Sequence, residues 1–241
     1  YRGQSRALLL NRIHEASRTR PVKPAEHFAA LAFEPRAPHP GSVPDPRLAR
    51  RPERERGVRA KFDIGREGPP IVLCTATGAG ESHRWPARHY ASLIALLASE
   101  RPESEVLLVG PAVERRAATE IAALSGQAAR NLCGETSLDE AIAIVAQAAG
   151  VVSADTGLMH VAAAYARPQV ALFGPSDPRR APPRSARAHV EWLHLGCSPC
   201  SEPRCPLAHQ ACMQRIVPSQ VFETLSRAMR FETSGARPAP R

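Results

Sequence analysis

The sequence predicts an α/β fold built on a doubly wound parallel sheet. Downstream of Pro70, short apolar runs alternate with longer stretches of helical spacing. Strands separated by helices of about 10–15 residues are typical of a parallel sheet. The apolar runs are short and continuous, as in strands buried between two helical layers. Such sheets bind ligands at the carboxyl ends of their strands, so a binding site is expected in the loops after them.

Each element of this repeat has its own signal. The first strand, Ile71 to Cys74, is a short apolar run, and the next helix begins at the Trp85-Pro86 pair. Gly110-Pro111 ends the second strand, and a turn from Gly134 to Ser137 precedes a further helix. The other strands are expected at 105–109, 150–153 and 169–173, and the helices at 86–99, 113–124, 138–148 and 158–166.

Composition divides the chain into four parts. Residues 1–34 contain one expected helix, from Pro24 to Phe33. Residues 35–70 are interrupted by prolines and end in a highly charged stretch, which is typical of an exposed linker or domain crossover. The expected folded domain then covers residues 71–230, and residues 231–241 are expected to be a disordered tail.

The bulk properties are those of a soluble globular protein. The 241 residues are 43% hydrophobic with a mean hydropathy of −0.28. No run approaches the roughly 18 apolar residues that cross a bilayer, and no signal peptide is recognisable, so a cytoplasmic location is expected. The sequence starts at Tyr1 in a helix-forming stretch, and we expect further sequence upstream.

The formal net charge of +9 favours anionic partners. However, 30 of the 32 basic residues are Arg, alongside 24 Pro, which is typical of the compositional drift of a GC-rich coding sequence. With 5% aromatic residues there is also little surface on which bases could stack. Nucleic acid is therefore disfavoured, while attraction to an anionic membrane surface stays open.

The segment from Asp155 to His160 predicts an anion site. A strand ends just before Asp155, a Thr156-Gly157 turn comes next, and a helix opens at Leu158. Free backbone N–H groups and the helix dipole favour an anion there, and Gly157 permits close approach of a phosphate. His160 could donate to a diphosphate oxygen, and Asp155 suits sugar hydroxyls. The alternative is that Asp155 and Thr156 only cap the helix and that His160 is a core residue.

The wider run from Asp155 to Pro178 resembles the heptosyltransferases of glycosyltransferase family 9. The resemblance extends to Arg84-Trp85-Pro86, to the run from Asn131 to Leu138 and to the cysteine segment at 197–212. It covers about residues 71–225, with a weaker match from Arg6 to Phe33 to the end of an acceptor domain. It implies a two-domain GT-B arrangement in which the C-terminal domain holds ADP-heptose, and inverting transfer of heptose to the lipopolysaccharide inner core.

The resemblance also implies roles for individual residues. Asp155, Thr156, Gly157, Leu158 and His160 match the family's donor-binding segment. Glu114 matches an acidic residue that binds the ribose hydroxyls; otherwise it reads as a solvated residue of a first helical turn. Thr75 and Thr77 come after the first strand and could donate hydroxyls to phosphate.

His83 departs from the family, which usually has a Lys at this position. A neutral imidazole supplies less positive charge to the leaving diphosphate than an ammonium does. Three consequences are open: Arg84 supplies the positive charge instead, transfer activity is reduced, or catalysis prefers a lower pH. The family's catalytic base lies in a glycine-containing turn near the start of its N-terminal domain. No such turn precedes the linker, so no catalytic residue is assigned and the base is expected upstream.

Four cysteines at 197–212 predict a metal site. Cys197, Cys200, Cys205 and Cys212 are spaced closely enough to bind a metal through four thiolates, or through three with His209 or His194 nearby. Zinc in a structural role is the first choice, and no cofactor is expected for the chemistry. Cys74 and Cys133 have apolar surroundings and are expected in the core.

Three hypotheses result. The first is a heptosyltransferase that uses an ADP-heptose donor and a lipopolysaccharide core acceptor, with peripheral association at the inner membrane. The second is a non-catalytic fragment that binds nucleotide sugars. The third is a basic, zinc-containing nucleic-acid-binding module, which leaves the strand and helix repeat unexplained.

Overall fold

A computed structural model describes residues 24–34, 43–75 and 80–233. The chain forms two compact units, one of residues 1–45 with 178–182 and one of the remaining residues. In the smaller unit the described residues include helix α1, Pro24–Ala30. The larger unit contains the sheet and the helices that pack on it.

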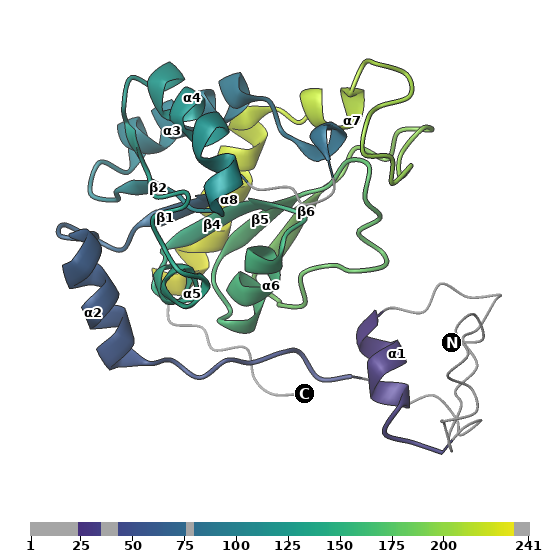
Figure 1. The fold of residues 1–241 in the computed structure, drawn as a ribbon, viewed down its shortest axis with the longest axis horizontal. Helices are drawn as coiled ribbons and strands as arrows, with labels where there is room; N and C mark the ends of the chain where they lie inside the picture. The colour runs from purple at the N-terminus through teal and green to yellow at the C-terminus, as the bar shows by residue number, and fades with distance from the viewer. Residues whose placement is uncertain (1–23, 35–42, 76–79, 234–241) are drawn as a thin grey trace. The chain divides into compact units, whose positions relative to one another are not determined.

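The sheet of the larger unit is parallel throughout, in the order β3-β2-β1-β4-β5-β6. Figure 1 labels the strands from β2 to β6 in this order. Chain order reverses between β1 and β4, where Ile71 pairs with Gly150 and Cys74 with Ser153. The strands are β1 Ile71–Cys74, β2 Val106–Leu108, β3 Ala129–Asn131, β4 Gly150–Ala154, β5 Gln169–Leu172 and β6 Ala188–Glu191.

Helices cover both faces of this sheet. Because side chains alternate along a strand, Ile71 and Leu73 pack into one core, while Val72 and Cys74 pack into another. The first core lies under α3 Ala87–Glu100, α4 Arg115–Leu124 and α8 Pro218–Thr233, and the second under α2 Pro52–Phe62, α5 Leu138–Ala146 and α6 Gly157–Ala164. Shorter elements are the 3-10 turns η2 Glu81–His83 and η3 Ala112–Glu114 and the helix α7 Ala211–Gln214.

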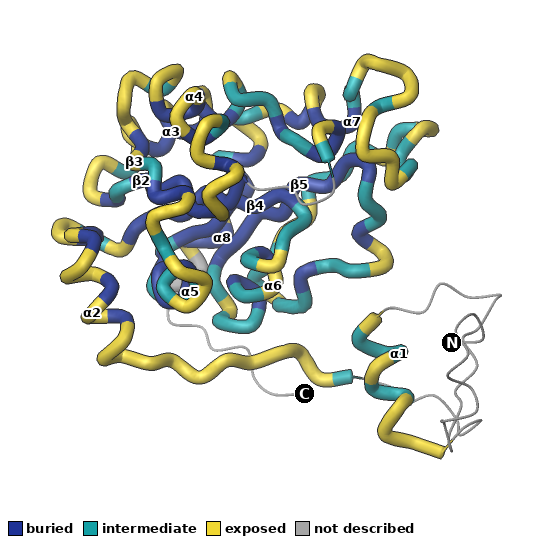
Figure 2. Tube along the Cα trace, viewed as in Figure 1, coloured by how far each residue is buried: buried dark blue, intermediate teal, exposed yellow. Residues whose placement is uncertain are grey.

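The predicted fold class is confirmed, and the four predicted strands lie within one residue of their expected bounds at either end. β3 and β6 were not predicted. They are the two edge strands, and their partly exposed residues do not form an apolar run. The stretch expected to be a linker also contains α2, which buries Val58 and Phe62 (Figure 2).

Leu225 on α8 provides a test of this packing. It is fully buried in the first core, so Leu225→Ala is expected to lower the free energy of unfolding by about 2–5 kcal/mol. Leu124→Ala, at a side chain that is 55% exposed, is the matched control and should change it by less than about 1 kcal/mol. Urea denaturation measures both, and equal losses would contradict the assigned core.

Candidate functional site: a cleft at the carboxyl ends of the strands

A cleft of about 920 Å³ opens where three neighbouring strands end. Cys74 ends β1, Gly110 lies two residues beyond β2, and Asp155 comes directly after β4. This is the point at which the chain order of the sheet reverses, the usual ligand position in such sheets. The other lining residues are Pro111, Thr136, Ser137, Leu138, Ala141, Ile142, Thr156, Gly157, Leu158, His160 and Val161.

The amino end of α6 faces this cleft without a side-chain cap. Thr156 is the N-cap residue, but its side chain makes no capping bond to the helix and instead lies 3.2 Å from the Ser153 hydroxyl. A Cβ added at Gly157 would meet nothing within 4 Å. The first-turn N–H groups of a helix have no partner within the helix, so these can bind an anion. The alternative that Asp155 and Thr156 merely cap α6 finds no support here.

His160 is exposed and lines the cleft one turn into α6. The alternative that it is a buried core residue is therefore wrong. Asp155 and Thr156 are half-buried at the same wall, beside Leu158. All five residues predicted from the segment at Asp155 thus come together around one cavity.

His83 is buried close to Asp155. Its side chain is on η2 and is only 6% exposed, and its Nε2 atom has no hydrogen-bond partner among the described residues. Burial lowers the pKa of His83 below its ordinary value, and the nearby Asp155 carboxylate partly opposes this. The imidazole is therefore neutral at pH 7.

Arg84 is held by Glu114. The Arg84 Nη1 and Nη2 atoms donate to the two Glu114 carboxylate oxygens at 2.5 and 2.7 Å. Glu114 is 3% exposed, so the interpretation of a solvated first-turn residue is wrong. The hydrogen bond to Glu114 is also the main cause that raises the pKa of Arg84. Because the Glu114 carboxylate compensates its charge, Arg84 in this arrangement supplies less positive charge to a diphosphate than an unpaired lysine would.

Thr75 and Arg84 line a second, smaller cavity of about 310 Å³ rather than the main cleft. The Thr75 hydroxyl is buried and has no oxygen or nitrogen partner among the described residues. Thr77, predicted with it, lies outside the described residues. The donor residues predicted from the family therefore divide between the main cleft and its surroundings.

Sequence reasoning missed one wall of the cleft. Thr136, Ser137 and Leu138 lie at the start of α5, where Ser137 forms a capping box with Glu140. The Gly134 to Ser137 turn was predicted, but its contribution to the site was not. The sequence signal that could have found it is Leu138, an apolar residue at the predicted start of a helix. In the structure its side chain is 72% exposed.

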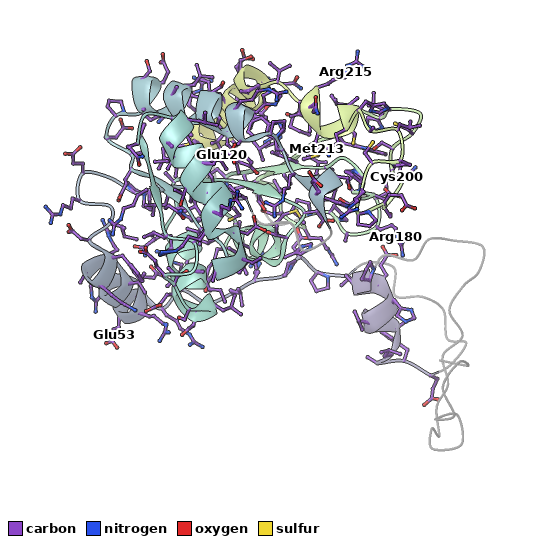
Figure 3. The ribbon with its side chains drawn as sticks, turned by 45° about the horizontal axis from the view of Figure 1, so that its top comes forward. Glu53, Glu120, Arg180, Cys200, Met213 and Arg215 are labelled. Atoms are coloured by element: carbon purple, nitrogen blue, oxygen red, sulfur yellow. The ribbon has the colours of Figure 1, made fainter. Side chains whose placement is uncertain are left out.

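The four clustered cysteines lie in loops near α7 and on it, and Figure 3 shows Cys200 in this region. The backbone N–H of Gln210, together with those of three neighbouring residues, lowers the pKa of Cys205. Burial raises the pKa of Cys212, and the other three cysteines add to this. Within the described part of the chain, no three His, Cys, Asp or Glu side chains are grouped to hold a metal ion.

Cys74 and Cys133 are core residues, as predicted. Neither is exposed, and burial raises the pKa of Cys74 to about 12 and that of Cys133 to about 11. Both thiols are therefore protonated at neutral pH and chemically inert.

Comparison with known proteins shows to which family the chain is similar. The model of glycosyltransferase family 9 (heptosyltransferase) matches residues 1–211. Lipopolysaccharide heptosyltransferase 2 of Escherichia coli K12 is 34% identical over 94% of this chain and 67% of its own length. Lipooligosaccharide heptosyltransferase 2 of Haemophilus influenzae is 34% identical over 81% of this chain and 59% of its own.

Solved structures show the same fold. The structure of E. coli ADP-heptose lipopolysaccharide heptosyltransferase II matches with a TM-score of 0.79 and 33% identity, over 93% of this chain and 67% of that one. A family 9 glycosyltransferase from Veillonella parvula matches with a TM-score of 0.65 over 80% of this chain and 56% of that one. Its 16% identity shows a shared fold alone.

The Arg84–Glu114 pair can be tested by removing one partner. Arg84→Ala leaves a buried carboxylate uncompensated and is expected to lower the free energy of unfolding by about 1–3 kcal/mol, because Arg84 itself is partly exposed. Arg88→Ala, at an exposed neighbour, is the control and should be near neutral. Urea denaturation of Arg84→Ala, Glu114→Ala and the double variant should show that the two residues are coupled. Strictly additive losses in the free energy of unfolding would contradict a direct ion pair.

Proposed function

The chain belongs to glycosyltransferase family 9, and on that basis we propose that it binds ADP-heptose for transfer of heptose to the lipopolysaccharide inner core. The observation that carries the proposal is the uncapped amino end of α6, which faces a cleft large enough for a nucleotide sugar. The chain spans 67% of the length of the E. coli relative. Its proposed part in the reaction is to bind the donor.

In the proposed reaction, an acceptor hydroxyl oxygen bonds to the anomeric carbon of heptose from the face opposite the diphosphate. The bond between that carbon and the phosphate oxygen breaks, and ADP leaves with the electron pair. The N–H groups of α6 and the His160 imidazole would stabilise the negative charge that develops on ADP. The proton of the acceptor passes to a general base, a role that we assign to none of the described residues.

Each part of the donor has proposed partners around the cleft. The diphosphate would bind at Thr156, Gly157, Leu158 and His160, and Asp155 would accept from sugar hydroxyls. Glu114 would accept from the ribose diol through the carboxylate lone pairs that Arg84 leaves free. The Thr75 hydroxyl, which lacks an oxygen or nitrogen partner among the described residues, would donate to a phosphate oxygen.

A second candidate function is a non-catalytic protein that binds nucleotide sugars. His83 favours it, since burial lowers the pKa of this imidazole at a position where the family resemblance implies a lysine. Heptose transfer to a truncated lipid acceptor separates the two functions. A basic nucleic-acid-binding module is the third, and thermal stabilisation by duplex or single-stranded nucleic acid, but not by ADP, would be required for it.

We also propose a cytoplasmic location with peripheral association at the inner membrane. No helix in the described ranges is long and apolar enough to span a bilayer. A lipopolysaccharide acceptor is lipid-linked, so its transferase must work at a membrane surface. The net charge of +9 favours attraction to anionic lipid.

For the cysteine segment we propose a structural zinc bound by Cys197, Cys200, Cys205 and Cys212, with His209 as an alternative ligand. Because no three of these side chains are grouped for a metal in the described residues, zinc binding would require them to move closer together. The N–H groups directed at Cys205 would stabilise a ligating thiolate, which supports the proposal. In the structure, however, His209 Nδ1 accepts the N–H of Ala211, which disfavours this nitrogen as a ligand.

Gly157→Ala tests the anion site directly. The added methyl group would enter open space where we place the diphosphate, so ADP affinity should fall on the order of tenfold, while stability stays equal or rises. Gly57→Ala, at a helical glycine with equally open surroundings in α2, is the control and should leave ADP affinity unchanged. Calorimetric titration with ADP measures both, and unaltered affinity in Gly157→Ala would reject the assignment.

His83 predicts a pH dependence. Bound diphosphate favours the protonated imidazole, and the pKa of His83 is lowered in the free protein, so ADP should bind more tightly as pH falls from 7 towards 5. His83→Lys should bind ADP more tightly at pH 7 and raise turnover in a heptose transfer assay. His83→Gln should flatten the pH profile more than His160→Gln does, and an unchanged profile would exclude His83 from the donor site.

Metal analysis of the purified protein tests the zinc proposal. About one equivalent of zinc or iron per chain is expected, and Cys205→Ser should lose it together with thermal stability. Cys133→Ser, at a core cysteine away from the segment, should keep the metal. A metal content far below one equivalent in the wild-type chain would remove the proposal.

A further inference from the structure

Four arginines meet in a groove of about 350 Å³ at the amino ends of the strands, the end opposite the donor cleft. Arg50, Arg56 and Arg59 come from α2 and the segment before it, and Arg167 comes from the loop between α6 and β5. We call these four residues the arginine groove. Its floor includes Pro70, which directly precedes β1.

The groove contains one carboxylate, and that carboxylate is already neutralised. Both oxygens of Glu55 accept from Arg50, with the Nε to Oε1 distance at 2.7 Å, and this bond is the main cause that lowers the pKa of Glu55. Glu55 is 7% exposed and points inward. With four arginines and one carboxylate, the lining of the groove carries a net positive charge.

Backbone oxygens help to hold two of these guanidinium groups in place. Arg59 donates to the Gly65 carbonyl, and Arg167 donates to the carbonyls of Tyr165 and Ala148 at 3.3 and 3.4 Å. Arg56 is exposed, and its side chain has no hydrogen bond or ion pair within the described ranges. A carbonyl oxygen carries no net charge, so the bond to Gly65 positions the Arg59 cation without cancelling it, which is the arrangement that phosphate recognition requires.

The chain around the groove is basic and open. From Pro46 to Glu67 there are eight basic residues and four acidic ones. The segment leading into α2 is exposed along its length (Figure 2). Leu48 is 46% exposed between Arg47 and Arg50, so an apolar side chain lies among cations. A soluble phosphate compound offers no apolar surface for this leucine to contact, whereas the acyl region of a lipid interface does.

We propose that the arginine groove and its flanking residues Arg47, Leu48 and Arg51 bind phosphate groups at an anionic lipid surface. The groove would take lipid phosphates, and Leu48 would enter the boundary of the acyl chains. The inference deepens the proposed function, on which it rests, because it names the surface by which a transferase with a lipid-linked acceptor would dock. Since the groove and the donor cleft lie at opposite ends of the strands, docking leaves the cleft open to ADP-heptose.

Three charge variants of the full chain test the proposal, all at exposed positions without a described side-chain partner. Arg56→Glu replaces a positive charge in the groove by a negative one, and Glu53→Lys replaces a negative charge on the same helix by a positive one. Arg215→Glu is the matched control, because Arg215 lies beside α7 and Glu53 on α2 at opposite sides of this unit (Figure 3). Circular dichroism and thermal stabilisation by ADP confirm that each variant is folded.

Binding is measured by sedimentation with vesicles of phosphatidylcholine alone or mixed with phosphatidylglycerol, at low and physiological salt. We expect wild type to bind only the anionic vesicles, less tightly at higher salt. A charge near the surface is worth about 1 kcal/mol, so Arg56→Glu should weaken binding by on the order of tenfold or more, and Glu53→Lys should strengthen it by a similar factor. Arg215→Glu should stay within about twofold of wild type.

The contrary outcomes are distinct. Equal weakening by Arg56→Glu and Arg215→Glu would mean that net charge alone drives binding, and would overturn the proposal, as would absence of wild-type binding. If inorganic phosphate stabilises the protein against heat in a way that depends on Arg56, and the protein does not bind vesicles, the groove would be assigned to a soluble anion instead. Binding of duplex DNA that depends on Arg56 would assign it to nucleic acid. If ADP does not stabilise the wild type against heat, the proposed donor site would be rejected, and this outcome is independent of the vesicle measurements.

Discussion

Backbone pairing between β1 and β4 is the constraint on which the donor cleft depends. The paired residues of these strands are 79 positions apart in sequence, and their register sets Cys74 opposite Ser153. After each strand, a loop departs toward a different face of the sheet, so space opens between the two loops. The uncapped end of α6 faces that space only because β4 is held in this register.

Burial then determines the chemistry around the cleft. Burial lowers the pKa of His83, and the buried Glu114 carboxylate accepts two hydrogen bonds from Arg84. The two neighbours His83 and Arg84 therefore have different roles. His83 lies near Asp155, and its Nε2 atom has no partner among the described residues. Arg84 binds the Glu114 carboxylate, whose remaining lone pairs can still accept from hydroxyl groups.

The two ends of the sheet have opposite surroundings. At the carboxyl ends, the cleft combines free N–H donors with apolar walls such as Leu138 and Val161. At the amino ends, α2 brings arginines beside Arg167. α2 is held on α5 by ion pairs from Arg54 to Asp139 and from Lys61 to Glu140, and by its buried Val58 and Phe62. Its place in the fold thus depends on a few contacts within a highly charged segment.

Features that depend on neighbouring residues could be predicted from the amino-acid order alone. The apolar runs predicted β1, β2, β4 and β5, because a buried parallel strand needs continuous apolar residues whatever its partners. The helix start after Asp155 predicted an anion site for the same local reason. The motifs also identified the family, since they are short runs of contiguous residues.

Features that depend on distant residues emerged only in the folded chain. The partner of Arg84 lies 30 residues away, the Asp155 carboxylate that acts on His83 follows another strand, and Arg167 lines the same groove as the arginines of α2. β6 and α2 escaped prediction because their stability comes from pairing and docking rather than from their own hydrophobicity. Folding brings such groups together at particular distances, and those distances decide which groups are paired, which are neutral and which remain available to a ligand.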